Sequence, residues 1–347
     1  MLQGTEKRNV TIVDIARAAN VSRAAVSLVL RSRPGVGAET RARVLGAMRE
    51  LGYVYNRGAA NLRQSRSSVV GMIINDLSNP FFAQLAIGIE RALSISGFMP
   101  FIANSAESVV RQNDLVRSMR EHGAVGLILC PSFETDAEAL NELSAAFPLV
   151  IAVRRIAGAR VAVAVSENEL GAHRATQHLL GLGHRRIAFI GGRSSAVVRK
   201  DRVAGYRAAL QESGIALDPA LEVESMPTRV GGIDAMNAAL TMTERPTACL
   251  CFNDVVALGA MIAAQRHGLK VGEDMAIVGF DDIAEASLAT PPLTTVAVDA
   301  EALGEHAARL LLDQIRGGVA AAGSYIGDAQ LVVRGSCGSR VQSGGWQ

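Results

Sequence analysis

The chain has 347 residues, of which 49% are hydrophobic and 20% are charged, and its formal net charge is +2. This composition excludes a disordered chain, and the length predicts two or three domains. No apolar run approaches the ~18 residues that span a bilayer, and the first residues do not resemble a signal peptide. The four cysteines, Cys130, Cys249, Cys251 and Cys337, form neither a C-x-x-C pair nor a disulfide framework, so we expect a cytoplasmic protein.

The net charge conceals an uneven distribution along the chain. Residues 1–66 contain 12 basic and 4 acidic residues, a charge of +8, whereas the remainder carries −6. A strongly basic segment attached to a mildly acidic body predicts a polyanionic partner for that segment alone. A basic solubilising tail is the alternative, but the patterning of this segment for helices disfavours it.

Three short helices are predicted in the basic segment, over residues 11–19, 22–30 and 38–51. Thr11, with Asp14 three residues later, can cap the first helix, and Ser22 can cap the second. Asn20 suits the left-handed residue that ends the first helix, and Gly52 ends the third. Apolar residues at helical spacing are expected to form the core: Ile12, Ile15, Ala19, Val26, Val29, Leu30, Val44, Leu45, Met48 and Leu51.

Two short helices joined by a tight turn and braced by a third are typical of a helix-turn-helix. Ser22, Arg23, Ala24 and Ser27 lie off the buried stripe near the start of the second helix. Backbone N–H groups and hydroxyls there can hold phosphate while Arg23 reaches a base edge. We therefore predict double-stranded DNA as the partner, with a phosphate contact as the alternative role of Arg23.

The run VTIVDIARAANVSRAAVSLVLRSRPGVGAETRARVLGAMRELGYVYN resembles the headpiece of the lactose-repressor/galactose-repressor (LacI/GalR) family of bacterial transcription factors. The spacing of V-S-x-x-x-V-S, E-T-R and E-L-G-Y is typical of that family. The resemblance implies DNA contacts by Thr11 and by the second helix. Many members carry Arg at the position of Leu28, where leucine offers only apolar contact, and Ala24 replaces a frequent polar residue.

Residues 56–63, NRGAANLR, resemble the hinge helix of this family. The resemblance implies that Asn56, Arg57, Ala59 and Leu62 lie in the DNA minor groove, with Leu62 wedged between base pairs. Such a segment is too short to be a stable helix alone, and Gly58 weakens it further. A plain interdomain linker is the alternative. We assign residues 1–55 to the headpiece, 56–66 to the hinge and 67–347 to the body.

The body alternates short apolar runs with amphipathic segments, which predicts an α/β fold with parallel sheets in two subdomains. The predicted strands lie at 69–75, 98–104, 126–130, 148–153, 186–192, 247–252 and 275–280. The predicted helices lie at 80–96, 111–122, 170–182, 203–213, 234–242, 255–267 and 301–316. Ligands of such sheets bind beyond the carboxyl ends of the strands.

The body also resembles the same family, in NDLSNPFFAQLAIGIE, HLLGLGHRRIAFIGG, RVAGYRAAL, CFNDVVALGAM, IVGFDDI and PPLTTV. The implied fold is an N-terminal all-α helix-turn-helix headpiece plus a body like periplasmic sugar-binding proteins, with chain crossovers near 165, 292 and 325. The resemblance places Arg202, Asn253 and Asp281 in an effector cleft. Taken singly, each has a structural alternative: a surface charge, a helix cap and a turn residue.

Asp76, Phe81 and Phe82 are candidates for the other wall of the cleft, with one phenylalanine in the core and the other facing ligand. Glu167 stands where the family often has aspartate. Trp346, in the C-terminal tail, offers no indole for stacking on a sugar. We expect a sugar or sugar acid as effector.

Several other functions are disfavoured. The chain contains no dinucleotide fingerprint, no nucleophile elbow and no phosphate-binding P-loop, so we expect neither an enzyme nor a cofactor. His173 and His178 are five residues apart, which suits solvated helix positions better than a metal site. The tail has no leucine heptads, so we expect a homodimer on a palindromic operator. A solute-binding protein and an NAD-dependent enzyme are the rival interpretations.

Overall fold

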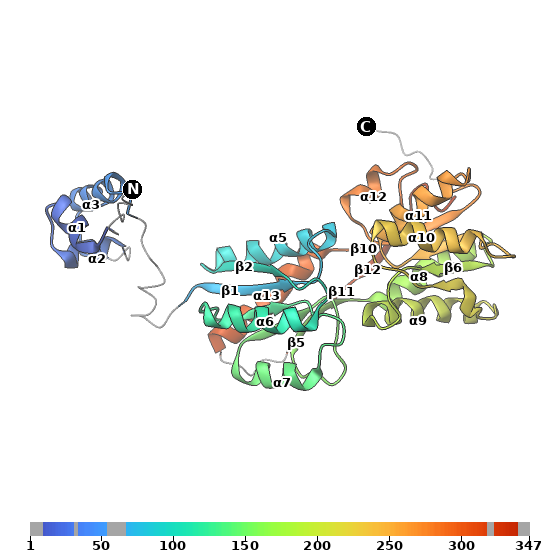
Figure 1. Cartoon of the computed structure of the whole chain (residues 1–347), viewed down its shortest axis with the longest axis horizontal. Helices are drawn as coiled ribbons and strands as arrows, with labels where there is room; N and C mark the ends of the chain where they lie inside the picture. The colour runs from blue at the N-terminus through green and yellow to red at the C-terminus, as the bar shows by residue number, and fades with distance from the viewer. Residues whose placement is uncertain (1–9, 31–33, 54–66, 318–322, 339–347) are drawn as a thin grey trace, which may run out of the picture. The chain divides into compact units, whose positions relative to one another are not determined.

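The computed structural model describes residues 10–30, 34–53, 67–317 and 323–338. The chain divides into two compact units, Met1–Ser67 and Ser68–Gln347, which we call the headpiece and the body and describe separately. In Figure 1 the body is drawn with its labelled strands and the helices that cover them.

The headpiece contains α1 (Ile12–Ala18), α2 (Arg23–Leu30) and α3 (Ala38–Glu50), so the three predicted helices are confirmed. Thr11 and Asp14 form a capping box at the start of α1: the Thr11 N–H donates to the Asp14 carboxylate at 2.9 Å, and the Asp14 N–H donates to the Thr11 hydroxyl. Asn20 has a φ of 51°, which lets the chain turn sharply between α1 and α2.

The headpiece core is made by small and branched side chains from all three helices, which are Ile15, Ala16, Ala19, Val26, Val29, Val44 and Ala47. The prediction that Leu45 and Leu51 belong to this core is wrong, because they are 44% and 37% exposed. Val44, Ala47 and Met48 form the buried face of α3, and Leu45 lies about 100° around the helix from Val44.

Two six-stranded sheets are formed by the described residues of the body. The first has the order β11-β5-β4-β3-β1-β2, and its pairs are all parallel. Its strands are β1 (Val69–Ile74), β2 (Met99–Asn104), β3 (Leu127–Leu129), β4 (Leu149–Ala152), β5 (Ala162–Ser166) and β11 (Ser324–Gly327). We call this sheet and its helices the first lobe.

The second lobe has the strand order β12-β10-β9-β8-β6-β7. Its strands are β6 (Ile187–Ile190), β7 (Glu222–Val223), β8 (Ala248–Cys251), β9 (Ala276–Asp281), β10 (Thr294–Val298) and β12 (Ala329–Val332). The expectation of parallel sheets holds except at one edge, where β12 pairs antiparallel with β10. This strand arrives directly from β11 of the other sheet rather than through a helix, so nothing returns the chain to the parallel direction.

Helices pack in pairs within each lobe. The helices of the first lobe are α5 (Pro80–Ile95), α6 (Val109–Glu121), α7 (Ala137–Ala146) and α13 (Ala300–Gly317). Those of the second are α8 (Asn168–Gly181), α9 (Val197–Glu212), the 3-10 helix η1 (Pro219–Leu221), α10 (Arg229–Leu240), α11 (Asp254–Arg266) and α12 (Ala284–Leu288). α5 and α13 lie side by side because Gly88 brings its backbone against the Glu301 carbonyl.

The chain passes between the lobes three times, after β5, after β10 and between β11 and β12. Residues 167, 299 and 328 stand at these passages. The first and third are close to the predicted positions, whereas the passage expected near 292 comes only after β10, because that strand still belongs to the second sheet. None of the helices that the structure describes combines the length and the apolar character that a membrane span requires.

Candidate DNA-binding surface and effector cleft

The start of α2 presents an exposed polar surface. Ser22, Arg23 and Ala24 are exposed, and the Ser22 hydroxyl accepts a hydrogen bond from the Ala25 N–H at 3.1 Å. This bond fixes the first turn of the helix and leaves the Arg23 side chain free to extend. Such an arrangement suits a helix that meets the edge of a nucleic-acid groove with its N-terminal end.

Two of the three other predicted DNA-contact residues of the headpiece are less open. Ser27 and Leu28 are half-buried, and Leu28 lies against the turn at Gly35. The exposed Thr11 donates its hydroxyl to the Asp14 carboxylate at 2.6 Å, so it has a structural role in capping α1. The predicted hinge contacts, Asn56, Arg57, Ala59 and Leu62, lie outside the described residues.

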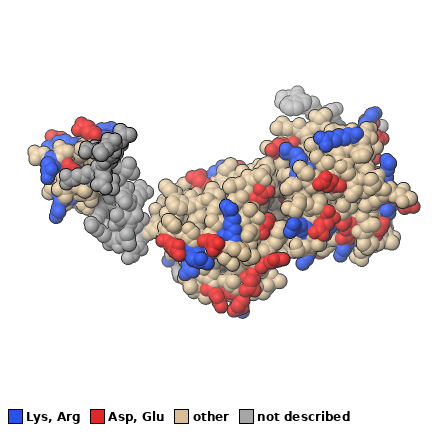
Figure 2. All heavy atoms as spheres, viewed as in Figure 1, with Lys and Arg blue, Asp and Glu red and all other residues tan. Residues whose placement is uncertain are grey.

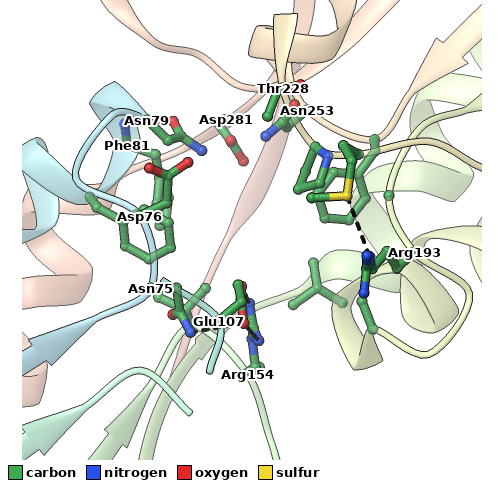
Figure 3. Close-up of a pocket in the computed structure, with 18 of the residues that line it drawn as sticks. Asn75, Asp76, Asn79, Phe81, Glu107, Arg154, Arg193, Thr228, Asn253 and Asp281 are labelled. Carbon is green, nitrogen blue, oxygen red and sulfur yellow. Dashed lines mark hydrogen bonds and ion pairs between the residues drawn. The ribbon is translucent and has the colours of Figure 1, made fainter. Parts of the chain in front are cut away.

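A cavity of about 350 Å³ lies between the two lobes of the body, and we call it the cleft cavity. Six of the seven predicted effector residues line it: Asp76, Phe81, Phe82, Arg202, Asn253 and Asp281. Figure 3 shows Asp76 and Phe81 on one wall and Asn253 and Asp281 on another. Residues more than 200 positions apart in the sequence are therefore brought together at the carboxyl ends of the strands.

Arg202, in α9, is buried at the second-lobe wall with each end of its guanidinium occupied. Its Nε donates to the Asn168 amide oxygen at 2.9 Å, and its Nη1 donates to the Phe252 carbonyl. Its Nη2 donates to Asp281 at 3.3 Å. The Arg202 guanidinium carbon lies 3.6 Å from the Phe280 ring centroid, a cation–π arrangement. The interpretation of Arg202 as a surface charge is excluded, since only 5% of the residue is exposed.

Asp281 ends β9 with a φ of 117°, which turns its buried carboxylate toward Arg202. Burial raises the pKa of Asp281 to about 6, although the nearby Arg202 charge lowers it. Asp254 is also buried: it accepts a hydrogen bond from the Thr295 hydroxyl at 2.5 Å and another from the Ile283 N–H. Burial raises the pKa of Asp254 well above its usual value, and the Asp281 charge adds to that effect.

Asn253 combines the two roles that its sequence position suggested. Its side-chain oxygen caps α11 by accepting a hydrogen bond from the Val256 N–H at 2.9 Å. It also lines the cleft cavity, where its amide nitrogen can reach a ligand. The cap and the ligand contact are therefore compatible in one residue.

The first-lobe wall begins directly after β1. Asp76 accepts hydrogen bonds from the Ser78 N–H and hydroxyl at 2.8 and 2.6 Å, and Asn79 caps α5. Phe81 and Phe82 pack edge to face with ring centroids 5.5 Å apart, and both are buried and line the cavity. The expected division into one core and one ligand-facing phenylalanine is therefore not seen.

Sequence reasoning missed three polar residues of the first lobe. Arg154 forms a bidentate ion pair with Glu107, at 3.0 and 2.8 Å, and Asn75 donates to the same carboxylate at 3.2 Å. Two buried atoms of this group have no hydrogen-bond partner among the described residues: the Asn75 side-chain oxygen and the Arg154 Nε. Asn75 is the last residue of one predicted strand and Arg154 directly follows another, which was the available signal.

Backbone strain is concentrated around the cavity. Ala106, Glu107 and Val153 have φ values of 51°, 57° and 73°, and all three line it. Left-handed backbone is costly for residues with a Cβ, and especially for a β-branched residue such as Val153. Strain of this kind is commonly retained where it positions functional groups, and here it aims Glu107 and Arg154 at the cavity.

The remaining site prediction places Glu167 in the cleft, but Glu167 does not line the cavity. It stands at the start of α8, and its backbone bonds to Gly171 and Gly327. The next residue, Asn168, takes the inward position and holds Arg202. His173 and His178 are not simply solvated, since His173 contacts Glu212 at 2.8 Å and His178 contacts Cys337 at 3.3 Å.

Comparison with known proteins agrees with both units of the fold. Residues 11–56 match the profile of bacterial regulatory proteins of the lacI family, and residues 176–337 match a periplasmic binding protein-like domain. The chain is 33% identical to the HTH-type transcriptional repressor CytR of Escherichia coli strain K12 over 329 residues, covering 94% of this chain and 96% of CytR.

Two further similarities extend this result. The chain is 33% identical over 307 residues to the ribose operon repressor of Haemophilus influenzae, covering 88% and 92% of the two chains. It superposes with a TM-score of 0.85 and 29% identity on the lac repressor dimer bound to operator and the anti-inducer ONPF, covering 96% of this chain and all of that one. These matches define the class as DNA-binding transcriptional regulators. The chain belongs to the lacI family of bacterial regulatory proteins.

Proposed function

We propose that the chain is a transcriptional repressor that binds a palindromic operator as a homodimer and is controlled by a small molecule in the cleft cavity. The observation that carries this proposal is the pairing of two separate surfaces in one chain. One is the exposed, capped start of α2 in a basic headpiece, and the other is a mixed polar and aromatic cavity in the body. The similarity of this chain to three repressors over most of their length supports the proposal: CytR, the ribose operon repressor and the lac repressor.

On the DNA side, Arg23 is the candidate for direct contact with a base. Ser22, Ala24, Ser27 and Leu28 would complete the surface in the major groove, and Thr11 would contact the backbone. The hinge residues Asn56, Arg57, Ala59 and Leu62 remain part of this proposal on the sequence pattern alone.

In the body, the proposed effector is a sugar or sugar acid held by Asp76, Phe81, Phe82, Arg202, Asn253 and Asp281. Aromatic rings can pack on the faces of a sugar ring while amide and carboxylate groups bind its hydroxyls. Effector binding would change the relative position of the lobes and so couple the cleft to the headpiece, a coupling that typically amounts to about 1–3 kcal/mol. No catalytic step or cofactor is part of the proposal.

An exposed apolar surface on the first lobe supports the homodimer. It consists of side chains on α5 and on β2, the edge strand of the first sheet: Ile87, Ile95, Met99, Phe101 and Ile102. Apolar side chains exposed on two elements that pack together suit contact with a second copy of the chain. On the face of the body that Figure 2 shows, acidic and basic side chains are interspersed, so DNA binding is assigned to the headpiece. We propose a cytoplasmic location, since that is where operator DNA is.

The test is protection of genomic DNA fragments by the full-length chain. We expect a footprint of dimer size with two symmetric half-sites, and an affinity that falls steeply with salt because phosphate contacts release counterions. Arg23→Ala should cost about 1–3 kcal/mol and relax one position in each half-site. Arg266→Ala, in the body helix α11, is the matched control and should leave the footprint unchanged. Binding without sequence preference would contradict the proposal.

A further inference from the structure

Helix α9 begins without a side-chain cap. Its N-cap residue is Ala196, whereas side chains of Asn79, Asp136, Thr228 and Asn253 cap other helices of the body. The N–H groups of residues 197–199 form no hydrogen bond with the described part of the chain. The first turn of this 16-residue helix therefore carries three free donors and the positive end of the helix dipole.

This first turn faces the space between the lobes. Gly192, Ala196 and Val198 line the cleft cavity, and Ser195 and Val197 line an adjoining cavity of about 490 Å³. Gly192 has a φ of 74°, and a Cβ there would lie 2.7 Å from the Phe252 ring, so glycine is needed to bring the chain this close. The first turn of α9 therefore borders both cavities.

Two arginines, one from each lobe, accompany the turn. Arg193 is exposed and lines the cleft cavity, and among the described residues it has no ion pair; its Nε donates to the Met226 sulfur at 3.4 Å. Arg154 reaches from the first lobe and lines both cavities, although only 9% of the residue is exposed. Its Nε is a buried donor without a partner. Both observations call for an acceptor that the described residues do not supply.

The carboxylates of the cavity do not fill this need. Glu107 is neutralised by Arg154, and Asp281 is neutralised by Arg202. Asp76 lies on the opposite wall from Arg193, as Figure 3 shows, and accepts hydrogen bonds from Ser78. Glu134 and Asp136 line the adjoining cavity from the first lobe, where Asp136 caps α7. Glu224 bonds to Ser194 close to Arg193 and Arg199 but forms no ion pair with Arg193 among the described residues. The Arg193 guanidinium at the start of α9 is therefore left without a paired carboxylate. On the first-lobe side, the Asn75 oxygen is an acceptor without a donor, which suits a ligand hydroxyl.

We infer that the effector is an anion: a sugar carrying a phosphate or a carboxylate, with that group bound at the first turn of α9 between Arg193 and Arg154. Its hydroxyls would face Asn75 and Asn253. This inference rests on the proposed function, since it names the chemical class of ligand for the same cleft. It differs from a neutral sugar, which would leave the free N–H groups and Arg193 unused.

The experiment compares each neutral sugar with its anionic forms on the full-length protein. Glucose, gluconate and glucose 6-phosphate form one set, and ribose and ribose 5-phosphate form another. Thermal shift finds the binders, and calorimetry then gives their affinities. We expect an anionic member to bind at least tenfold more tightly than its neutral counterpart. Comparing the affinity of gluconate with that of glucose 6-phosphate then shows whether the site prefers a carboxylate or a phosphate. A neutral sugar that binds as tightly, or no shift with any anionic sugar, would overturn the inference.

Two substitutions locate the anion. Arg193→Gln should weaken the anionic ligand at least tenfold, whereas Lys200→Gln, which removes an exposed charge one turn further along α9, should change it less than twofold. Ala196→Asp adds a carboxylate cap at the anion position, so it should raise the melting temperature of the free protein and abolish the ligand-induced shift. Full retention of anion affinity in Arg193→Gln would refute the site even if Ala196→Asp failed to fold.

Different measurements test the anion site and the proposed function. Operator binding by the ligand-free protein tests the function, and ligand affinity in the absence of DNA tests the anion site. A protein that binds its operator but responds only to neutral sugars would keep the function and lose the inference.

Discussion

Each lobe of the body buries one arginine–carboxylate pair at the cleft, but the two pairs are built differently. Arg202 and Asp281 each have 6% of their side chain exposed and share a single contact of 3.3 Å. Arg154 and Glu107 share two contacts, and their side chains are 10% and 23% exposed. Asp281 takes its one side-chain hydrogen bond among the described residues from Arg202, whereas Glu107 also accepts from Asn75 and from the Phe133 N–H.

The difference shows that a residue in the cleft can serve the fold, the ligand or both. Arg202 has each end of its guanidinium occupied by protein atoms and stacks on Phe280, so it holds β9, α8 and α9 in place. Arg154 keeps a donor free and sits beside strained backbone at Val153. The second-lobe pair therefore serves the fold in addition to the proposed ligand contact, and the first-lobe pair is better suited to change its contacts when a ligand arrives.

The largest expected effect is that of Arg202→Ala. It would leave Asp281 buried without its counter-charge, and breaking a buried pair in this way costs about 3–5 kcal/mol in the free energy of unfolding. Arg154→Ala should cost about half as much, because Glu107 keeps two other donors. Urea denaturation at pH 7.5 measures both. Equal losses for the two variants would remove the distinction between the pairs.

The pH dependence of stability tests the burial of Asp281 in the second-lobe pair. The folded pKa of Asp281, about 6, lies above its ordinary value of 3.8, so the folded state binds this proton more tightly. The stability that protonation gives is complete below about pH 4 and is lost as the pH rises through 6. Between pH 4 and 7, wild type should therefore lose about 2 kcal/mol relative to Asp281→Asn.

Denaturation of wild type and Asp281→Asn at several pH values tests this prediction. Asp254 is present in both proteins, so its contribution cancels in the difference between them. A difference between wild type and Asp281→Asn that stays constant from pH 4 to 7 would show that Asp281 titrates normally.

The smallest expected effect comes from the strained backbone of the first lobe. Ala106 is exposed and has a φ of 51°, so its methyl group gives little packing and adds strain. Ala106→Gly should raise the free energy of unfolding by about 0.5–1 kcal/mol. Ala139→Gly, at an exposed position in the regular helix α7, is the control and should lower it by about 1 kcal/mol. A loss at Ala106 as large as that at Ala139 would rule out strain there.

Much of this architecture could be predicted from the sequence, because it depends on local patterns. The apolar periodicity and the Thr11–Asp14 and Ser22 caps predicted the three headpiece helices, and alternation of strands and helices predicted the two-lobed body. Arg202, Asn253 and Asp281 were found because they follow strands or begin helices within motifs that resemble a known family. The residues that match local rules were the ones placed correctly.

What could not be predicted depends on contacts between distant segments. Glu107 becomes a cleft residue only because Ala106 and Glu107 adopt left-handed backbone and meet Arg154, 47 positions away. Glu167 and Asn168 are adjacent, and only the direction of the first turn of α8 decides which of them faces Arg202. The early starts of α9 and α10, at Val197 and Arg229, were missed because their first turns mix valine with arginine, lysine or glycine and show no helical apolar spacing.

The three passages of the chain between the lobes affect the order of events during synthesis. Domains generally fold as they leave the ribosome, N-terminal part first. Here the first lobe needs α13 and its edge strand β11, which end at Gly317 and Gly327, so it cannot be completed before the second lobe has almost fully emerged. The lobe that is translated first is thus held unfinished until nearly the whole polypeptide exists, and a chain truncated near residue 299 would have no complete lobe.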